Sequence, residues 1–187
     1  MTDWPVFIRD ELTPTHLSTY GGNFAGGEFR TTMTANLAAT SGDWPVANTA
    51  FFIPFAIPYH YVIERFFWAN GATVGHNVDV GVYNLEGTKL CSTGSTVSSG
   101  ASAIQYAAIS GFSSWILPPG RYYFGHACGG TTTAVMTTTT ITANAMRLGG
   151  VLQQATALPL PATMASAVAV TSAGYALAGF TRTDSGF

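Results

Sequence analysis

The fold is decided by the aromatic and β-branched run Tyr61-Val62-Ile63-Glu64-Arg65-Phe66-Phe67-Trp68, which is followed by Asn70-Gly71. A run of this kind favours a pleated strand, and Asn-Gly supplies the positive φ angles of a tight turn. The next run, residues 78–83, alternates valine with Asp, Gly and Tyr, as in a half-buried strand. The two runs predict successive strands joined by a turn.

Further short strands are predicted on both sides of this pair. Apolar residues 50–58 contain Pro54 and Pro58, each of which removes a ladder donor, so this strand is expected at an edge or a bend. The Thr-rich residues 129–140 fit either a strand or a long polar loop. The remaining predicted elements are strands at residues 89–91, 104–109, 121–127, 167–171 and 175–181, and an extended crossing segment at residues 151–161. The last two strands are expected to form a hairpin with its turn at Ala173-Gly174.

About eight short strands, turn signals at intervals of roughly ten residues and no helix of useful length predict an all-β protein built as a β-sandwich. A jelly roll is the predicted form, because the Pro-rich crossing before the final strands suits the long connection of a Greek key. An immunoglobulin-like sandwich is the structural alternative. We expect the sandwich to span residues 49–187.

Residues 1–48 have a different pattern, with few periodic apolar positions and many turn formers. A disordered tail is one interpretation, but such tails are normally poor in aromatic residues and rich in charge. We therefore predict an extended N-terminal arm that becomes ordered against a neighbouring subunit. Its candidate interface residues are Trp4, Phe7, Tyr20, Phe24, Phe29 and Trp44.

The composition narrows the class of partner. Charged residues make up 9% of the chain, against about 25% in typical soluble domains. This is typical of secreted β proteins and of proteins packed inside a large assembly, and unusual for a cytosolic metabolic enzyme. A net charge of -2 without a basic cluster argues against a nucleic-acid or anionic-membrane partner. We see neither a membrane-spanning apolar stretch nor a secretory signal.

No catalytic residue, cofactor or metal site is predicted. Cys91 and Cys128 are expected to be free buried thiols rather than a disulfide. His126 with Cys128, or His76 with Asp79, would permit a zinc proposal, but no ligand pair with metal-site spacing repeats. A nucleophile elbow is absent, and no pair of acids is obviously opposed across a cleft. We expect a protein without enzymatic activity.

Glu64 and Arg65 are the most informative charges, because they interrupt a strongly apolar run. Adjacent strand residues point to opposite faces, so each needs a partner elsewhere. Since an unpaired buried charge is costly, we expect at least one of them to pair across a subunit interface. The alternative is that one of them simply faces solvent.

The strand aromatics also have two interpretations. They are either core and interface residues or a sugar-stacking platform on a lectin-like sandwich. The set comprises Trp68, Tyr83, Tyr106, Trp115, Tyr122 and Tyr123. No carboxylate cluster supports a calcium-dependent lectin. The candidate glycan contacts are Trp115, Tyr122 and Tyr123.

Six segments carry a resemblance to known proteins: residues 47–55 (ANTAFFIPF), 67–73 (FWANGAT), 77–83 (NVDVGVY), 92–96 (STGST), 117–123 (LPPGRYY) and 152–161 (LQQATALPLP). In this order they resemble small virion structural proteins of tailed bacteriophages. The resemblance implies a β-rich, non-enzymatic oligomer, often a trimer, that decorates heads or builds tail and fibre attachments. It transfers no catalytic residue.

Two functions follow as expectations. The first is a bacteriophage virion structural protein, assembled in the host cytoplasm, that docks on other capsid or tail proteins through its N-terminal arm as a homo-oligomer, with a trimer expected. The second is a carbohydrate-binding host-attachment module of a tail or head fibre. An enzyme such as a polysaccharide depolymerase is the least favoured.

Overall fold

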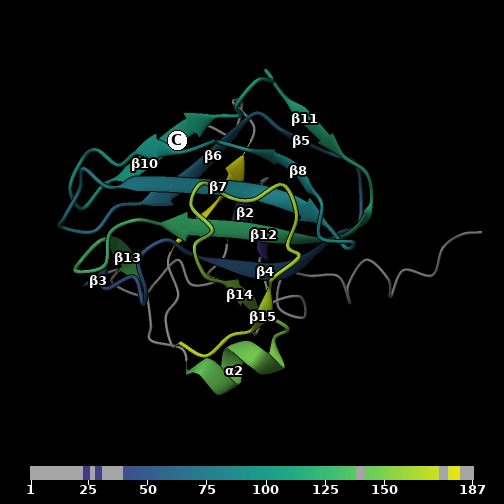
Figure 1. Cartoon of the computed structure of the whole chain (residues 1–187). Coiled ribbons are helices and arrows are strands. Elements are labelled where there is room, and N and C mark those ends of the chain that lie inside the picture. The colour runs from purple at the N-terminus through teal and green to yellow at the C-terminus, as the bar shows by residue number, and fades with distance from the viewer. Residues whose placement is uncertain (1–22, 26–27, 31–39, 138–141, 173–176, 182–187) are drawn as a thin grey trace, which may run out of the picture.

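The computed structural model describes residues 23–25, 28–30, 40–137, 142–172 and 177–181, which form an all-β protein with a short helix (Figure 1). The helix is α2 (Ala143–Leu148). The strands are β1 (Asn23–Ala25), β2 (Glu28–Arg30), β3 (Thr40–Gly42), β4 (Thr49–Ile57), β5 (Tyr61–Ile63), β6 (Arg65–Ala69), β7 (Asn77–Asn84), β8 (Lys89–Ser92), β9 (Thr96–Val97), β10 (Ile104–Ala108), β11 (Trp115–Leu117), β12 (Gly120–Cys128), β13 (Val135–Thr137), β14 (Leu152–Gln154), β15 (Val168–Ala169) and β16 (Ala178–Thr181).

Two antiparallel sheets contain most of these strands. The five-stranded sheet has the order β1-β2-β16-β6-β10, and the seven-stranded sheet has the order β15-β14-β4-β12-β7-β8, with β9 also paired to β7. β11 with β5 and β13 with β3 form two small ladders. Eight strands pair in a nested way: β2 with β16, β4 with β12, β6 with β10, and β7 with β8.

The two sheets pack face to face. Phe66 on β6 and Phe180 on β16 come from the smaller sheet, Phe124 on β12 comes from the larger one, and all three are fully buried. The ring centroid of Phe124 lies 6.4 Å from that of Phe66 and 6.2 Å from that of Phe180. The valines of β7 are buried in the same core, as their alternation predicted. Burial of each such side chain stabilises the fold by roughly 1.5–3 kcal/mol. Two antiparallel sheets that share this core confirm the predicted sandwich-like, all-β character. Asp79, Gly81 and Tyr83 on the other face of β7 are buried as well, so β7 is not the half-buried strand that was predicted.

The outer face of the seven-stranded sheet is covered by residues 155–167, which we call the strap. In Figure 1 it is the yellow-green loop in front of β7 and β12. Leu160 of the strap packs in a second apolar cluster with Phe52 and Tyr83. The Tyr83 hydroxyl donates a hydrogen bond to the Pro161 carbonyl at 2.7 Å, and Lys89 Nζ donates one to the Leu160 carbonyl at 2.7 Å. The crossing segment predicted at residues 151–161 is therefore β14 followed by the first half of the strap.

Removing the Tyr83 hydroxyl tests this attachment. Tyr83→Phe keeps the buried ring but leaves the Pro161 carbonyl without its donor. The free energy of unfolding is expected to fall by about 1 kcal/mol, measured by urea unfolding. Tyr106→Phe, which changes an exposed ring, is the matched control and should leave the curve unchanged. Equal stability of Tyr83→Phe and the parent chain would contradict this prediction.

Two predictions about the strands need correction. β4 lies between β14 and β12 rather than at an edge. Because β14 pairs only with residues 50–52, Pro54 falls beyond that ladder, where a missing N–H is tolerated. The last two strands do not form a hairpin, since β15 joins the larger sheet and β16 the smaller one.

Helix α2 was not predicted, because six residues are too few to show an apolar period. Thr142 caps it by accepting a hydrogen bond from the Ala145 N–H at 3.3 Å, and Gly149 follows its last turn. The sequence did contain signals for this helix: Thr142 as its N-cap, Arg147 near its C-terminal end, and Gly149-Gly150 directly after it. The described residues contain no helix with the length and hydropathy needed to cross a membrane.

Part of the segment assigned to the arm lies within the sheets of the same chain. β2 pairs with β16, and β3 pairs with β13. Trp44 is only 3% exposed, packs in the main core, and donates a hydrogen bond from Nε1 to the Thr49 carbonyl at 3.0 Å. The interface role predicted for Trp44 is therefore corrected to a core role, and a domain boundary at residue 49 would separate β2 from its partner strand.

Candidate functional site

The chain changes sheets at Glu64. The apolar run predicted as one strand is two: β5, which ends at Ile63 and pairs with β11, and β6, which begins at Arg65 in the five-stranded sheet. Between them, the Glu64 N–H donates a hydrogen bond to the Thr181 carbonyl at 3.1 Å. The strict alternation of side chains is broken at this point, so Glu64 and Arg65 line the same recess instead of facing apart.

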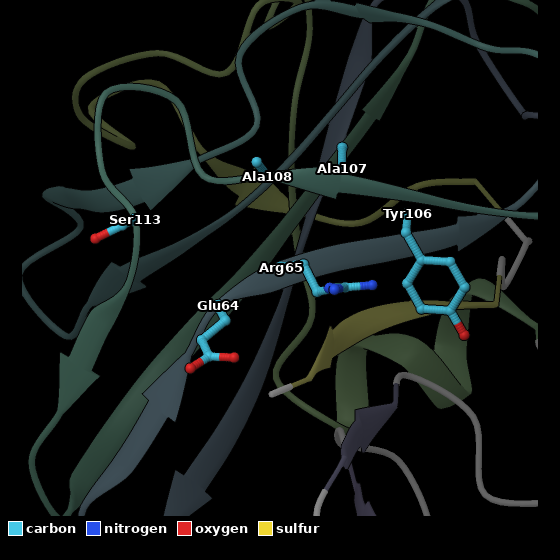
Figure 2. A pocket seen from close by; sticks show the side chains of 6 residues that line it. All are labelled: Glu64, Arg65, Tyr106, Ala107, Ala108 and Ser113. Atoms are coloured by element: carbon cyan, nitrogen blue, oxygen red, sulfur yellow. The ribbon is translucent and has the colours of Figure 1, made fainter. Parts of the chain in front are cut away.

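This hollow, the Arg65 recess, has a volume of about 460 Å³. Its lining residues are Glu64, Arg65, Tyr106, Ala107, Ala108 and Ser113 (Figure 2). Arg65 extends toward Tyr106, whereas the Glu64 carboxylate points away from Arg65. The Arg65 guanidinium carbon lies 5.9 Å from the centroid of the Tyr106 ring, which is cation–π geometry. The two small alanines leave the strand surface open.

Arg65 stands out electrostatically. Its side chain is half-buried, and within the described residues its guanidinium makes no ion pair and no hydrogen bond, only the contact with Tyr106. A guanidinium has five N–H donors in a rigid fork, which match pairs of oxygen atoms. The recess therefore combines unused donors, a carboxylate, a hydroxyl and an exposed aromatic ring. The sequence singled out Glu64 and Arg65 but gave no sign that Tyr106 and Ser113 would join them.

A second hollow, the Tyr123 recess, has a volume of about 440 Å³ and lies over β4 and β12. It is lined by Pro54, Phe55, Ala56, Leu85, Arg121, Tyr122, Tyr123, Leu148, Gly149 and Gly150. Leu148 is 86% exposed at its rim. Its lining is more apolar than that of the Arg65 recess.

The three predicted glycan contacts do not form one platform. Tyr122 is mostly buried, and its hydroxyl donates a hydrogen bond to the Pro118 carbonyl at 2.8 Å. Tyr123 is half-buried in the Tyr123 recess. Trp115 lies on β11 against Phe112, with ring centroids 5.1 Å apart, and lines neither recess.

The interface residues predicted in the N-terminal segment are only partly visible. Trp4, Phe7 and Tyr20 lie outside the described residues. Phe24 and Phe29 are paired partners in the ladder of β1 and β2. Their predicted contact with another subunit remains a prediction.

Asp79 is fully buried beneath the strap. Its carboxylate accepts hydrogen bonds from the Leu160 N–H at 2.9 Å and from the Thr93 hydroxyl at 3.1 Å. Burial raises the pKa of Asp79, and the hydrogen bonds and the nearby Lys89 charge oppose that rise. Asp79 therefore fastens the strap. Glu64, which lies between β5 and β6, does not face Asp79 across a cleft.

Two histidines lie close together near the end of the sandwich core. His126 is 2% exposed, its ring centroid is 4.6 Å from that of Trp44, and its Nε2 has no hydrogen-bond partner among the described residues. Burial, and then the charge of His76, lower the pKa of His126 to about 3. Burial also lowers the pKa of His76, whose Nε2 likewise has no partner in the described part of the chain.

Cys91 and Cys128 are free and buried, as predicted. Burial raises the pKa of each thiol to about 12, so neither is a reactive thiolate near neutral pH. Across the described ranges, no group of three or more His, Cys, Asp or Glu side chains is placed to hold a metal ion.

The chain matches no family model, no curated protein and no solved structure.

Proposed function

We propose that this chain is a non-enzymatic structural protein of a bacteriophage virion, whose sandwich is a jelly roll that assembles with copies of itself and with other virion proteins. The proposal draws on the charge-poor composition, on the resemblance of the six segments and on two features of the fold. These features are the nested strand pairing and an uncovered apolar strand.

The nested pairing supports the jelly-roll form. A jelly roll is one long antiparallel ribbon rolled into two facing sheets, so its first strand pairs with its last and the pairing continues inward. The orders β2-β16-β6-β10 and β4-β12-β7-β8 follow this scheme. Jelly rolls occur in viral capsid proteins and in lectins, so the form agrees with both functions expected from the sequence without choosing between them.

The observation that carries the structural role is the apolar character of β10. Among the described strands, β10 has a neighbour on one side only. Ile104 and Tyr106 on it are exposed, as are the large apolar residues Val97, Phe112 and Ile116 in adjoining segments. β10 contains no charge and no proline, the usual protection of an edge strand. We expect a second copy of the chain to cover the Ile104 end of β10.

Ile104→Lys tests this contact. We expect the parent chain to be an oligomer, with the trimer as the expected state, and Ile104→Lys to weaken association at least about tenfold. Sedimentation velocity over a concentration series measures both. Val168→Lys, at the end strand of the other sheet and similarly exposed, is the matched control and should assemble normally. A monomeric parent chain would refute the self-assembly.

The virion role is tested in particles. In a phage that carries this reading frame, purified particles should contain the protein in stoichiometric amounts by mass spectrometry. Deleting residues 1–22, which precede the first described strand, should leave the sandwich folded but abolish its incorporation. A deletion of residues 1–48 would also remove β2 and Trp44, and so would confuse unfolding with lost docking. Absence from purified particles, or normal incorporation after the shorter deletion, would overturn the role or its docking element.

A carbohydrate-binding module for host attachment is the second candidate. The Arg65 recess favours it, because unused guanidinium donors, a carboxylate and an exposed ring lie together there. The isolated protein should bind immobilised glycans on an array. Absence of binding to free sugars at about 10 mM, a weak affinity even for a shallow site, would exclude this candidate.

A further inference from the structure

We propose that the Arg65 recess binds a neutral saccharide ring through Arg65, Glu64 and Tyr106. This inference rests on the second function proposed above and assigns its site. Tyr106 belongs to the aromatic set considered in the sequence, but none of the three candidate glycan contacts Trp115, Tyr122 and Tyr123 lines this recess.

The first argument is the unsatisfied cation. Arg65 is half-buried, and among the described residues its guanidinium contacts only the Tyr106 ring. That contact holds the planar group in place, so its N–H donors are oriented before a ligand arrives. Two adjacent hydroxyl oxygens of a sugar match this fork.

The second argument concerns charge. Glu64 lines the same recess, so the lining carries one formal charge of each sign. The Glu64 carboxylate points away from Arg65 (Figure 2). A carboxylate has about four acceptor positions on its two oxygens, so it can accept from a sugar hydroxyl in addition to any other donor. An anionic ligand would gain from Arg65 but be repelled by Glu64. Hydroxyl groups satisfy both, since each donates and accepts.

The third argument concerns shape. The hollow of about 460 Å³ has small residues, Ala107 and Ala108, on its strand surface. Tyr106 is 42% exposed beside them. An exposed aromatic ring next to fixed polar groups suits the C–H face of a sugar, and Ser113 adds a hydroxyl at the far end.

The test uses the full chain and a panel of methyl glycosides of glucose, galactose, mannose and N-acetylglucosamine, with glucuronate and inorganic phosphate as anionic probes. Binding is followed by saturation-transfer NMR and titration calorimetry. At least one neutral glycoside should bind with a dissociation constant of about 1 mM. The anionic probes should bind at least about tenfold more weakly.

Arg65→Met should weaken binding at least about tenfold, and Tyr106→Ala should do so too, whereas Tyr106→Phe should bind normally. Arg121→Met is the matched control: it removes a guanidinium from the Tyr123 recess and should leave the affinity unchanged. Circular dichroism verifies that each variant is folded.

The outcomes are distinguishable. Loss of binding in Arg65→Met and Tyr106→Ala, with normal binding by Arg121→Met, supports the site. Loss in Arg121→Met with normal binding by Arg65→Met would move the ligand to the Tyr123 recess and overturn this inference, while the carbohydrate-binding function would stand. Preference for glucuronate or phosphate would overturn the neutral ligand class. No binding to any glycoside would refute both the site and the function.

Discussion

Asp79→Ala is expected to lower the free energy of unfolding by about 3 kcal/mol. Asp79 is fully buried, and it holds the strap to β7 through the Leu160 N–H, beside the hydrogen bond of Tyr83 to Pro161. Alanine would leave the Leu160 N–H without an acceptor under a layer that excludes water. The Thr93 hydroxyl would lose one of its two acceptors but keep the Gly94 carbonyl at 3.0 Å. For a chain of this length the loss corresponds to a fall in melting temperature of roughly 10 °C.

Asp79→Asn is the matched control. Its amide oxygen can accept from the Leu160 N–H as the carboxylate does, and its NH₂ can donate to the Thr93 hydroxyl oxygen. Asparagine also avoids the cost of burying a charge, so its stability near neutral pH should be within about 1 kcal/mol of the parent chain. Urea unfolding of both variants measures the difference. If asparagine costs as much as alanine, the hydrogen bonds of Asp79 do not hold the strap.

The difference in stability between the parent chain and Asp79→Asn changes with pH in a definite direction. Burial raises the pKa of Asp79 in the folded protein, so the folded state keeps a proton that the unfolded chain has already lost. The free energy of unfolding therefore falls as pH rises from the ordinary aspartate pKa through the raised one. Asparagine does not titrate, so the stability of Asp79→Asn relative to the parent should improve over that interval.

The all-β fold was predictable because it depends on local pattern. The alternating valines of β7 and the aromatic run before Asn70 each carry a period or a turn signal that survives in any context. The partner of each strand was not predictable in the same way. β4 contains Pro54 yet lies inside a sheet, because its neighbour β14 is short enough to leave the proline unpaired on that side. The length of a distant strand cannot be inferred from the proline itself.

The candidate site shows the same limit. Glu64 and Arg65 were marked by their charge in an apolar run, and a contact with a neighbouring subunit was foreseen for them. Their geometry was not, because a continuous strand was assumed, whereas the chain leaves one ladder and enters another at Glu64. Tyr106 joins Arg65 only through the pairing of β10 with β6. Neighbours of this kind are created by register, and no local pattern encodes register between strands about forty residues apart.

Acidification from about pH 7 to about pH 4 is expected to remove about 3 kcal/mol of stability through His126. Its pKa is lowered to about 3 in the folded protein, first by burial and then by the charge of His76. The unfolded chain binds a proton at the ordinary histidine pKa, but the folded state does not until near pH 3. Stability is therefore complete above the unfolded pKa and falls as the pH drops toward the folded one.

His126→Phe isolates this contribution. A phenyl ring preserves the packing against Trp44, 4.6 Å away between ring centroids in the parent, and removes both the titration and a buried nitrogen without a partner among the described residues. His60, which is exposed, supplies the control: His60→Gln should follow the parent profile. Urea unfolding at intervals of pH gives all three curves.

Other titratable groups also change the stability as the pH falls, but their contributions cancel when the parent chain is compared with His126→Phe. His76 destabilises the folded state on acidification in the same direction, because burial lowers its pKa as well. Asp79 acts in the opposite direction, because its pKa is raised. Both are present in the parent chain and in His126→Phe, so the difference between the two profiles belongs to His126. Parallel profiles would mean that His126 accepts a proton in the folded protein as readily as in the unfolded chain, and the end of the core near Trp44 would then have to admit water.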